Sequence, residues 1–301
     1  LSVCLSVCLS RVVSCGLVVA VVVVVVHTPH NTTERDVTGP VVLKRYSLGT
    51  RLSGPMRPGL TVFRGSDLER FGSHILIKIA ALELADSPAS ATAQMRNEHA
   101  ILTGPLSDCS GVPRVLAFGE DEVLAKNTGR PVRVLVLVED PLGVELPDQM
   151  TADEVQKLAR ALVKTLTSVH ARGVIHSDIK PDNLVLTDSG EVVLIDFGTS
   201  FLASESPKDE YGISHAYASD SLLQDDFLPP SFDTDFIALT FTLQALYAGV
   251  EWWERETALD RRPLLDRERH SFVQNLRAGE RLQPTFLALL DSVISLLERP
   301  N

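Results

Sequence analysis

The chain has 301 residues, of which 45% are hydrophobic and 22% are charged, a composition typical of globular proteins and unlike that of disordered or fibrous chains. Its formal net charge of −11, with 28 Lys and Arg against 39 Asp and Glu, argues against a nucleic-acid partner, because phosphate binding needs a basic face. Three of the four cysteines lie within the first fifteen residues and only Cys109 lies in the body of the chain, so neither a disulfide framework nor a zinc site can be built.

The first 26 residues are apolar apart from scattered serines and Arg11. As a helix, the run from Val12 to Val26 would span about 22 Å, which is short of the roughly 30 Å hydrocarbon core of a bilayer. Three interpretations stay open: translated low-complexity DNA, since a repeated CTGT tetranucleotide encodes the repeated LSVC; a membrane anchor; or a signal peptide. We expect a cytoplasmic protein, with a membrane contact only if this segment is a genuine anchor.

Residues 1–40 are therefore set apart as an apolar segment and a polar linker. After them, short apolar runs punctuated by glycine and proline predict the strands of an antiparallel sheet. The runs are TVF (61–63), HILIKIA (74–80), PRVLAFG (113–119) and VRVLVLVED (132–140). One helical segment interrupts them at Ala89–Leu102, with Ser87-Pro88 as its expected start. Residues 41–140 are expected to form a small sheet with one helix.

The period of the apolar residues changes at Thr151, where a long helix is predicted. Thr151 and Glu154 have the spacing of a capping box, and Gly173 follows the last turn. The apolar face of this helix consists of Val155, Leu158, Leu162, Leu166 and Val169. We expect it to be the first long helix of a mainly helical part, residues 141–301.

Three further features are predicted in that part. LVL and VVLI, joined by the turn DSG (188–190), predict a short hairpin. The segment DFIALTFTLQALYAG (235–249) is apolar nearly all round, which predicts a buried helix. Residues 199–234 are polar and irregular, and a loop of that length in a compact domain is usually functional.

The octapeptide HSDIKPDN (176–183) carries an unusual density of reactive groups, and the hairpin that follows leads to a second acid, Asp196. Transfer of a phosphoryl group from ATP needs metal ions, a positive charge beside the transferred group, and a carboxylate that accepts the proton of the attacking hydroxyl. Asp178 can be that base, and Lys180 can lie beside the γ-phosphate. Asn183 and Asp196 offer the oxygen ligands that Mg²⁺ prefers. The segment therefore predicts phosphoryl transfer with ATP and Mg²⁺ as cofactors.

HSDIKPDN followed by IDFG (195–198) resembles the catalytic loop and the metal-binding loop of eukaryotic protein kinases, whose general forms are HRDLKPEN and DFG. The resemblance extends over about residues 45–300. It implies that Lys78 of ILIKIA pairs with the α- and β-phosphates of ATP and that Glu98 pairs with this lysine. Taken alone, a strand lysine is usually a solvated edge residue and a helical glutamate is usually a surface charge, so both roles rest on the pattern.

The resemblance assigns two further features. VEDPLGVEL (138–146) resembles the hinge that hydrogen-bonds adenine, which makes Glu139 a cofactor-binding residue and Glu145 a contact to the ribose. Asp235 resembles the buried aspartate that holds the catalytic loop through backbone hydrogen bonds. An N-cap role is the alternative for Asp235, and the two roles are compatible.

The sequence departs from the family pattern at several positions. Ser177 replaces an arginine that binds an activation-segment phosphate in many members, so we expect activity that does not depend on that phosphorylation. The glycines at 49, 54 and 59 do not fit the GxGxxGxV spacing of the glycine-rich loop. Pro141 lacks an N–H and removes one adenine hydrogen bond, worth about 1 kcal/mol.

The family's APE triplet is expected at Ser219-Asp220-Ser221, where its glutamate is lost, and Arg299 is the candidate for the arginine that would pair with that acid. This departure predicts altered substrate docking and stability, and truncation at both ends of the sequence is one interpretation.

The resemblance thus implies an α+β, bilobal protein kinase-like fold, with a sheet lobe at residues 41–140 and a larger, mainly helical lobe at residues 141–301. The implied activity is transfer of the γ-phosphoryl group of Mg·ATP to Ser or Thr of a protein substrate, since Lys180-Pro181 favours Ser/Thr over Tyr. Two alternatives stay open: a pseudokinase that acts as a binding module, and a small-molecule phosphotransferase of the aminoglycoside or choline kinase type.

Overall fold

A computed structural model of the chain describes residues 40–52, 59–70, 74–82, 91–124, 129–205, 217 and 230–248. The expectations for residues 1–39, Gly54, Ser87-Pro88, Ser219-Asp220-Ser221 and Arg299 lie outside the described residues. Among the described helices, none combines the length and the apolar character that crossing a bilayer would need.

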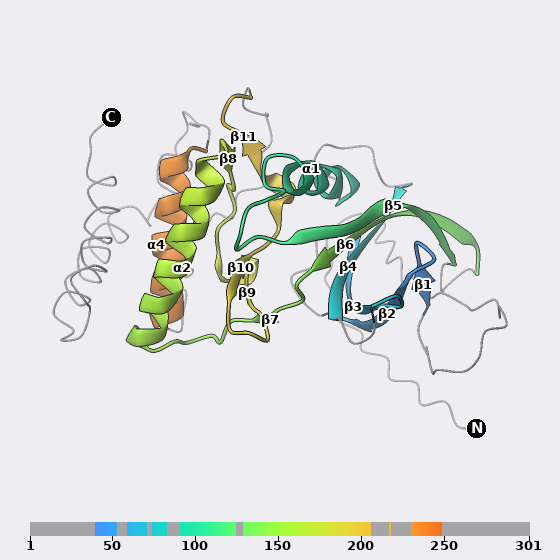
Figure 1. The fold of residues 1–301 in the computed structure, drawn as a ribbon, viewed down its shortest axis with the longest axis horizontal. Helices are drawn as coiled ribbons and strands as arrows, with labels where there is room; N and C mark the ends of the chain where they lie inside the picture. Colours follow the sequence, from blue (N-terminus) through green and yellow to red (C-terminus); the bar gives the residue numbers. More distant parts are fainter. Residues whose placement is uncertain are drawn as a thin grey trace, which may run out of the picture.

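The N-terminal part is built on a six-stranded sheet (Figure 1). Its strands are β1 (Val41–Val42), β2 (Tyr46–Arg51), β3 (Leu60–Asp67), β4 (His74–Ala81), β5 (Arg114–Leu124) and β6 (Pro131–Asp140). They lie in the order β1-β2-β3-β4-β6-β5, and every pairing is antiparallel. The four predicted runs fall within β3, β4, β5 and β6, apart from Pro113, which directly precedes β5, and this confirms the antiparallel sheet.

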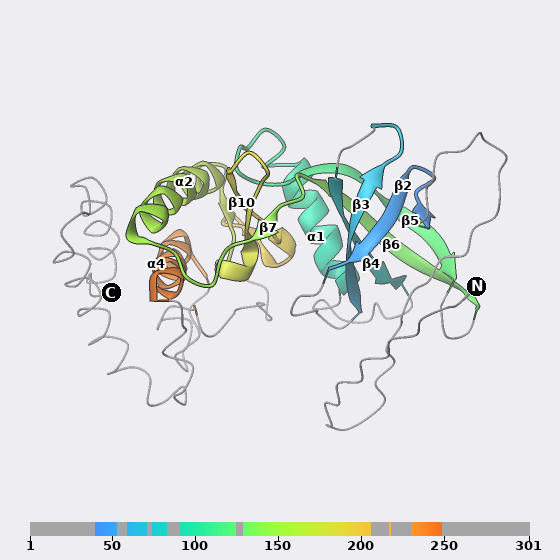
Figure 2. The ribbon, with the colours of Figure 1, turned by 90° about the horizontal axis from the view of Figure 1, so that it is seen from below.

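Helix α1 (Ala91–Thr103) covers one face of this sheet (Figures 1 and 2). Leu135 and Leu137 of β6 pack on that side against Met95, whereas Val136 and Val138 pack into the cluster on the opposite side. Because β6 is buried on both faces, its sequence is a continuous apolar run and does not alternate with polar residues. Along β6, successive side chains thus point to opposite faces of the sheet, and every second residue faces α1.

Helix α2 (Ala152–His170) begins at the predicted capping box. The Thr151 hydroxyl accepts from the Glu154 N–H at 3.4 Å, and the Glu154 carboxylate accepts from the Thr151 N–H at 2.8 Å. Gly173 follows with φ +75°, a left-handed conformation that suits glycine. The prediction of this helix and of its cap is confirmed.

The predicted hairpin is also present, as β9 (Leu184–Leu186) and β10 (Val192–Leu194) with Gly190 at φ +79° in the turn. Strand β7 (Val144–Glu145) pairs with β9. Gly143, just before β7, approaches β9 so closely that a Cβ there would lie 2.5 Å from Val185. The connection between the two parts of the chain is therefore held directly against the hairpin.

Helix α4 (Phe232–Ala248) lies beside α2 in both views, and the two helices share one apolar core (Figures 1 and 2). It begins before the predicted residue 235, because Ser231 and Thr234 cap it: the Ser231 N–H donates to the Thr234 hydroxyl at 2.8 Å. Asp235 thus lies inside the first turn, so the N-cap alternative for this residue was wrong.

The remaining described elements are short. They are β8 (Val174–Ile175), which pairs with β11 (Phe201–Leu202), and the 3-10 turns η2 (Pro181–Asn183) and η3 (Phe197–Thr199). Between residues 141 and 248 the described segments thus combine two long helices with short strands, and the rest of the predicted helical part, residues 249–301, lies outside them.

Candidate active site

Lys78 and Glu98 form a buried ion pair between β4 and α1. The Lys78 Nζ lies 2.7 Å from Glu98 Oε2, and the side chains are 8% and 3% exposed. Strand β4 is an inner strand, flanked by β3 and β6, so Lys78 is not a solvated edge residue. The predicted pairing of the two residues is present, and the surface alternatives for both are wrong.

Glu139 occupies a different position from the one expected for a hinge residue. It shares the strand parity of Leu135 and Leu137, so its side chain lies on the α1 side of β6 and is 1% exposed. Its Oε2 lies 3.0 Å from the Lys78 Nζ. The side chain expected to contact the cofactor is thus buried against Lys78, and it does not line the pocket described below.

These buried charges shift one another's ionisation. Burial lowers the pKa of Lys78, but the carboxylates of Glu139, Glu98 and Asp196 outweigh burial and raise that pKa above its ordinary value. Burial, reinforced by the negative charge of Glu139 and opposed by Lys78, raises the pKa of Glu98 to about 8. Lys78 therefore keeps its positive charge although it is buried.

The catalytic-loop segment brings three predicted residues together after β8. The Lys180 Nζ donates to Asp178 Oδ2 at 2.8 Å. The Asn183 Nδ2 donates to the same oxygen at 3.0 Å and to the Asp178 carbonyl oxygen at 2.6 Å. Asp178 is 3% exposed. The loop thus holds its carboxylate in a fixed place next to a positive charge.

Asp235 holds the backbone of this loop, as the sequence predicted. Its Oδ2 accepts from the His176 N–H at 2.8 Å and its Oδ1 accepts from the Ser177 N–H at 2.9 Å. The His170 Nε2 lies 2.9 Å from Oδ2. Since Asp235 is 1% exposed, these are buried contacts that tie the loop to helix α4.

Asp196, the residue before η3 and its N-cap, has φ +66°, a left-handed conformation that costs a non-glycine residue about 1–2 kcal/mol. The next residue is fixed by α1: the Phe197 N–H donates to Glu98 Oε1 at 3.0 Å. Asn97, beside Glu98, donates to the carbonyl oxygens of Gly198 at 3.0 Å and Ser200 at 2.7 Å. Helix α1 therefore positions the segment that carries Asp196.

Ser177, the departure from the family pattern, is built into the same segment. Its hydroxyl donates to the Thr199 carbonyl oxygen at 3.0 Å, and its φ is +68°. The Ser200 hydroxyl returns a bond to the His176 carbonyl oxygen at 3.2 Å. Hydroxyl groups thus join the catalytic loop to the start of residues 199–234 without an arginine at position 177.

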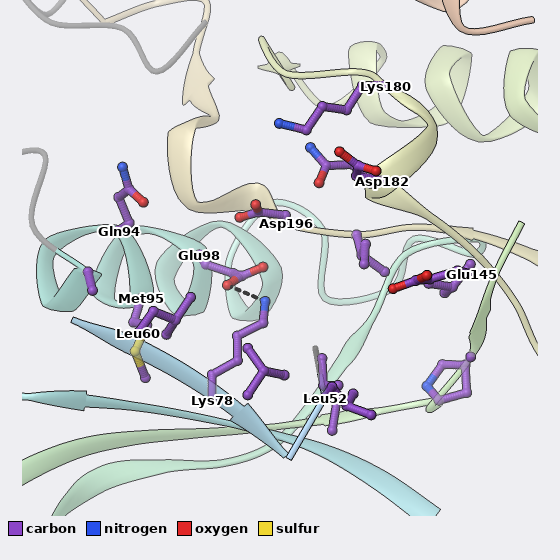
Figure 3. Close-up of a pocket in the computed structure, with 18 residues that line it drawn as sticks. Leu52, Leu60, Lys78, Gln94, Met95, Glu98, Glu145, Lys180, Asp182 and Asp196 are labelled. Atoms are coloured by element: carbon purple, nitrogen blue, oxygen red, sulfur yellow. Dashed lines mark hydrogen bonds and ion pairs between the residues drawn. The ribbon is translucent and has the colours of Figure 1, made fainter. Parts of the chain in front are cut away.

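A pocket lies between the sheet part and the α2–α4 part, where these segments meet. Six of the eight predicted site residues line it: Lys78, Glu98, Glu145, Lys180, Asn183 and Asp196. Figure 3 shows Asp196 between the Lys78–Glu98 pair and Lys180. Asp178 and Glu139 are not among the lining residues.

The apolar lining comes from elements on both sides of this pocket. Leu52, Leu60 and Val62 belong to the β2–β3 hairpin and its connection, and Val185 and Ile195 belong to β9 and the end of the β9–β10 hairpin. The predicted phosphate-covering segment is described only at its two ends, since residues 53–58 lie outside the described residues.

Three functional candidates escaped the sequence reasoning. Gln94 and Asp182 line the pocket and appear in Figure 3, and Asn97 holds the Asp196 segment. Asp182 lies within HSDIKPDN (176–183), so its place in that motif could have marked it as a pocket residue. Nothing local marks Asn97, because its partners lie about a hundred residues further along the chain.

Comparison with known proteins assigns the family. Residues 140–298, slightly more than half of the chain, match the protein kinase domain. The chain is 32% identical over 180 residues to CBL-interacting protein kinase 16 of Oryza sativa subsp. japonica, covering 58% of this chain and 36% of that protein. It is 25% identical over 187 residues to the probable serine/threonine-protein kinase pknA2 of Bifidobacterium longum, covering 55% of this chain and 22% of that protein.

A third relative, serine/threonine-protein kinase 17A of Oryctolagus cuniculus, is 28% identical over 130 residues, covering 39% of this chain and 32% of that protein. The chain thus spans about a third or less of the length of these curated relatives. The matching segment contains the catalytic loop, the Asp196 segment and α4, whose contacts are described above. The chain belongs to the protein kinase family.

Proposed function

We propose that this chain is a Mg·ATP-dependent protein kinase that phosphorylates Ser or Thr. The observation that carries the proposal is the meeting of five side chains, from residue 78 to residue 196, around one pocket: Lys78, Glu98, Lys180, Asn183 and Asp196. We infer that the nucleotide lies between a sheet lobe at residues 41–140 and a helical lobe at residues 141–301.

The apolar lining suits a nucleobase. Leu52, Val62, Val185 and Ile195 offer surfaces for the faces of a flat ring, as small-molecule pockets commonly do. Pro141 also lines the pocket and cannot donate a hydrogen bond, so the base would be bound with one hydrogen bond fewer. Glu145 belongs to β7, directly after the connection that follows β6, and lines the pocket, so its carboxylate would bind a ribose hydroxyl there.

The residues present fit a magnesium ion. Asn183 and Asp196 both line the pocket and offer oxygen ligands, and the amide nitrogen of Asn183 is engaged by Asp178. Among the described residues no cluster of three His, Cys, Asp or Glu could hold a metal. Mg²⁺ commonly takes one or two protein ligands and fills the rest with water and phosphate oxygens, so a two-residue site is sufficient. Bound there, the ion would neutralise charge that develops on the phosphates.

Asp178 and Lys180 would act on the transferred group. The carboxylate of Asp178 would orient the attacking hydroxyl and accept its proton, and Lys180, 2.8 Å away, would face the γ-phosphate. Lys78 would hold the α- and β-phosphates, supported by Glu98. Protein Ser or Thr as the acceptor is supported by Lys180-Pro181 and by two relatives that are named serine/threonine-protein kinases.

A pseudokinase is the second candidate, favoured by the additional carboxylate of Glu139 at Lys78 and by Pro141 in the pocket lining. Phosphoryl transfer from labelled Mg·ATP to basic proteins separates the two. We expect Asp178→Asn to lower the transfer rate by about 10²–10⁴ with little change in the Kd for Mg·ATP. The control Asp188→Asn, in the exposed hairpin turn, should transfer at the wild-type rate. Equal rates in wild type and Asp178→Asn would support the pseudokinase.

A further inference from the structure

Lys78 lies between two buried carboxylates. Glu98 reaches it from α1, with Nζ to Oε2 at 2.7 Å, and Glu139 reaches it from β6, with Nζ to Oε2 at 3.0 Å. None of the three side chains is more than 8% exposed. The Lys78 ammonium has three N–H donors, of which Glu98 accepts one, whereas Glu139 contacts the same nitrogen as an ion pair without a hydrogen bond. Lys78 also lines the pocket, so donors remain for an oxygen atom there.

The two carboxylates are held in place by different parts of the fold. Glu98 belongs to a helix, and its second oxygen accepts from the Phe197 N–H at 3.0 Å. Neither oxygen of Glu139 accepts a hydrogen bond from the part of the chain that the structure describes, beyond its ion pair with Lys78. Glu139 therefore has no other partner there that explains a buried charge.

Sheet register, and not helix position, sets the Lys78–Glu139 contact. Strands β4 and β6 are neighbours, with Lys78 opposite Leu137 and Leu76 opposite Glu139. The Lys78–Glu98 contact, in contrast, depends on where α1 lies on the sheet. Lys78 thus has one partner, Glu139, that is fixed within the same sheet and one, Glu98, that lies on a separate helix.

We propose that Glu139 is a positioning residue for nucleotide binding, which holds the Lys78 ammonium at the pocket from within the sheet when the carboxylate of Glu98 is lost. The proposal rests on the proposed function, because the group that Lys78 would meet is a nucleotide phosphate. Removing either carboxylate leaves the Lys78 ammonium with one carboxylate in ion-pair contact. Removing both leaves it with neither of these contacts and only the Coulombic attraction of Asp196. The effects of the two removals should therefore be strongly non-additive.

The first test is Mg·ATP binding by the full chain, measured by titration calorimetry on Glu98→Gln, Glu139→Gln and the double variant. We expect each single change to raise the Kd by less than about threefold and the double change to raise it by more than about thirtyfold. Glu120→Gln is the matched control, since its partly exposed carboxylate pairs with Arg96 and Arg133 on the surface. Combined with Glu98→Gln, it should give only the product of the single effects.

Two binding results would overturn the proposal. In one, the double variant shows only the product of its single effects. In the other, Glu139→Gln binds Mg·ATP more tightly than wild type, which would mean that Glu139 competes with phosphate for Lys78.

The second test does not require nucleotide binding. Acetylation of Lys78 by acetic anhydride is followed by mass spectrometry and normalised to the exposed Lys157. Both single variants should keep Lys78 charged and slow to react, and the double variant should react at least about tenfold faster. If wild type bound no Mg·ATP but this pattern appeared, the proposed function and the role of Glu139 in nucleotide binding would both fail, while the finding that Glu139 keeps Lys78 charged would stand. Equal labelling in all variants would overturn that role.

If circular dichroism shows that the double glutamine variant does not fold, Glu98→Gln/Glu139→Asp replaces it, because aspartate keeps the charge and is shorter by one methylene. We expect Lys78 labelling about threefold above that of Glu98→Gln. Labelling equal to that of Glu98→Gln would count against Glu139.

Discussion

At the scale of single residues, Asp235 shows how one buried carboxylate sets the shape of a loop. It accepts from two consecutive backbone N–H groups, those of His176 and Ser177, directly before the proposed base Asp178. Buried donors need partners, so the loop geometry depends on a side chain that follows it by about sixty residues.

The loss of one acceptor oxygen from Asp235 should therefore be costly. In Asp235→Asn the amide offers one acceptor oxygen, so one of the two N–H donors loses its partner, and we expect the free energy of unfolding to fall by about 2 kcal/mol. Asp233→Asn is the control, because Asp233 is exposed in the same first turn of α4. Urea unfolding measures both. Equal losses would show that Asp235 acts only through the helix terminus.

At the scale of elements, the capping box of Thr151 and Glu154 defines the start of helix α2. The side-chain and backbone hydrogen bonds from Thr151 lower the pKa of Glu154 below its ordinary 4.5. A carboxyl group whose pKa is lower in the folded state stabilises the fold above its unfolded pKa, and this contribution is lost as pH falls through the folded pKa. The cap should thus be strongest near neutral pH.

Two variants test this cap. Thr151→Ala should lower the free energy of unfolding by about 1 kcal/mol. Glu154→Gln should be less stable than wild type at neutral pH, and the difference should shrink as pH falls below about 4.5. Thermal unfolding across this pH range checks both outcomes. A difference that grows on acidification would contradict the capping role.

The link between α1 and η3 is a second property of elements. The Asn97 amide donates to carbonyl oxygens of the segment that follows Asp196. Asn97→Asp places a carboxylate, which cannot donate, against those oxygens, so we expect a loss of about 2–3 kcal/mol in unfolding free energy, larger than that of Asn97→Ala. Denaturant unfolding of the two variants gives the comparison. If Asn97→Asp were as stable as wild type, the amide would not join α1 to this segment.

At the scale of the whole molecule, local patterns predicted much of what the structure contains. The capping box, the β9–β10 hairpin and the sheet strands were predicted because neighbouring residues determine them. The Lys78–Glu98 pair and the loop contacts of Asp235 were predicted through the resemblance to a family. These two depend on contacts far apart in the chain, which periodicity alone does not reveal.

The side-chain direction of Glu139 shows where such prediction ends. A shift of one residue in a strand turns every side chain to the other face, so the face of Glu139 depends on the register of β6 against β4. The sequence placed Glu139 at the hinge, and the structure buries its side chain beside Lys78. The Asn97 contacts are a similar case, because only the folded chain brings α1 to η3.

The central claim is that a magnesium nucleotide binds where the sheet part meets the α2–α4 part, and a crystal structure with Mg²⁺ and a nonhydrolysable ATP analogue tests it most directly. We predict phosphate oxygens in contact with Lys78, the ion bound by Asn183 and Asp196, and the base among the apolar residues from β3 and β9. A nucleotide bound elsewhere, or phosphates that touch neither Lys78 nor a metal held by Asp196, would contradict the account.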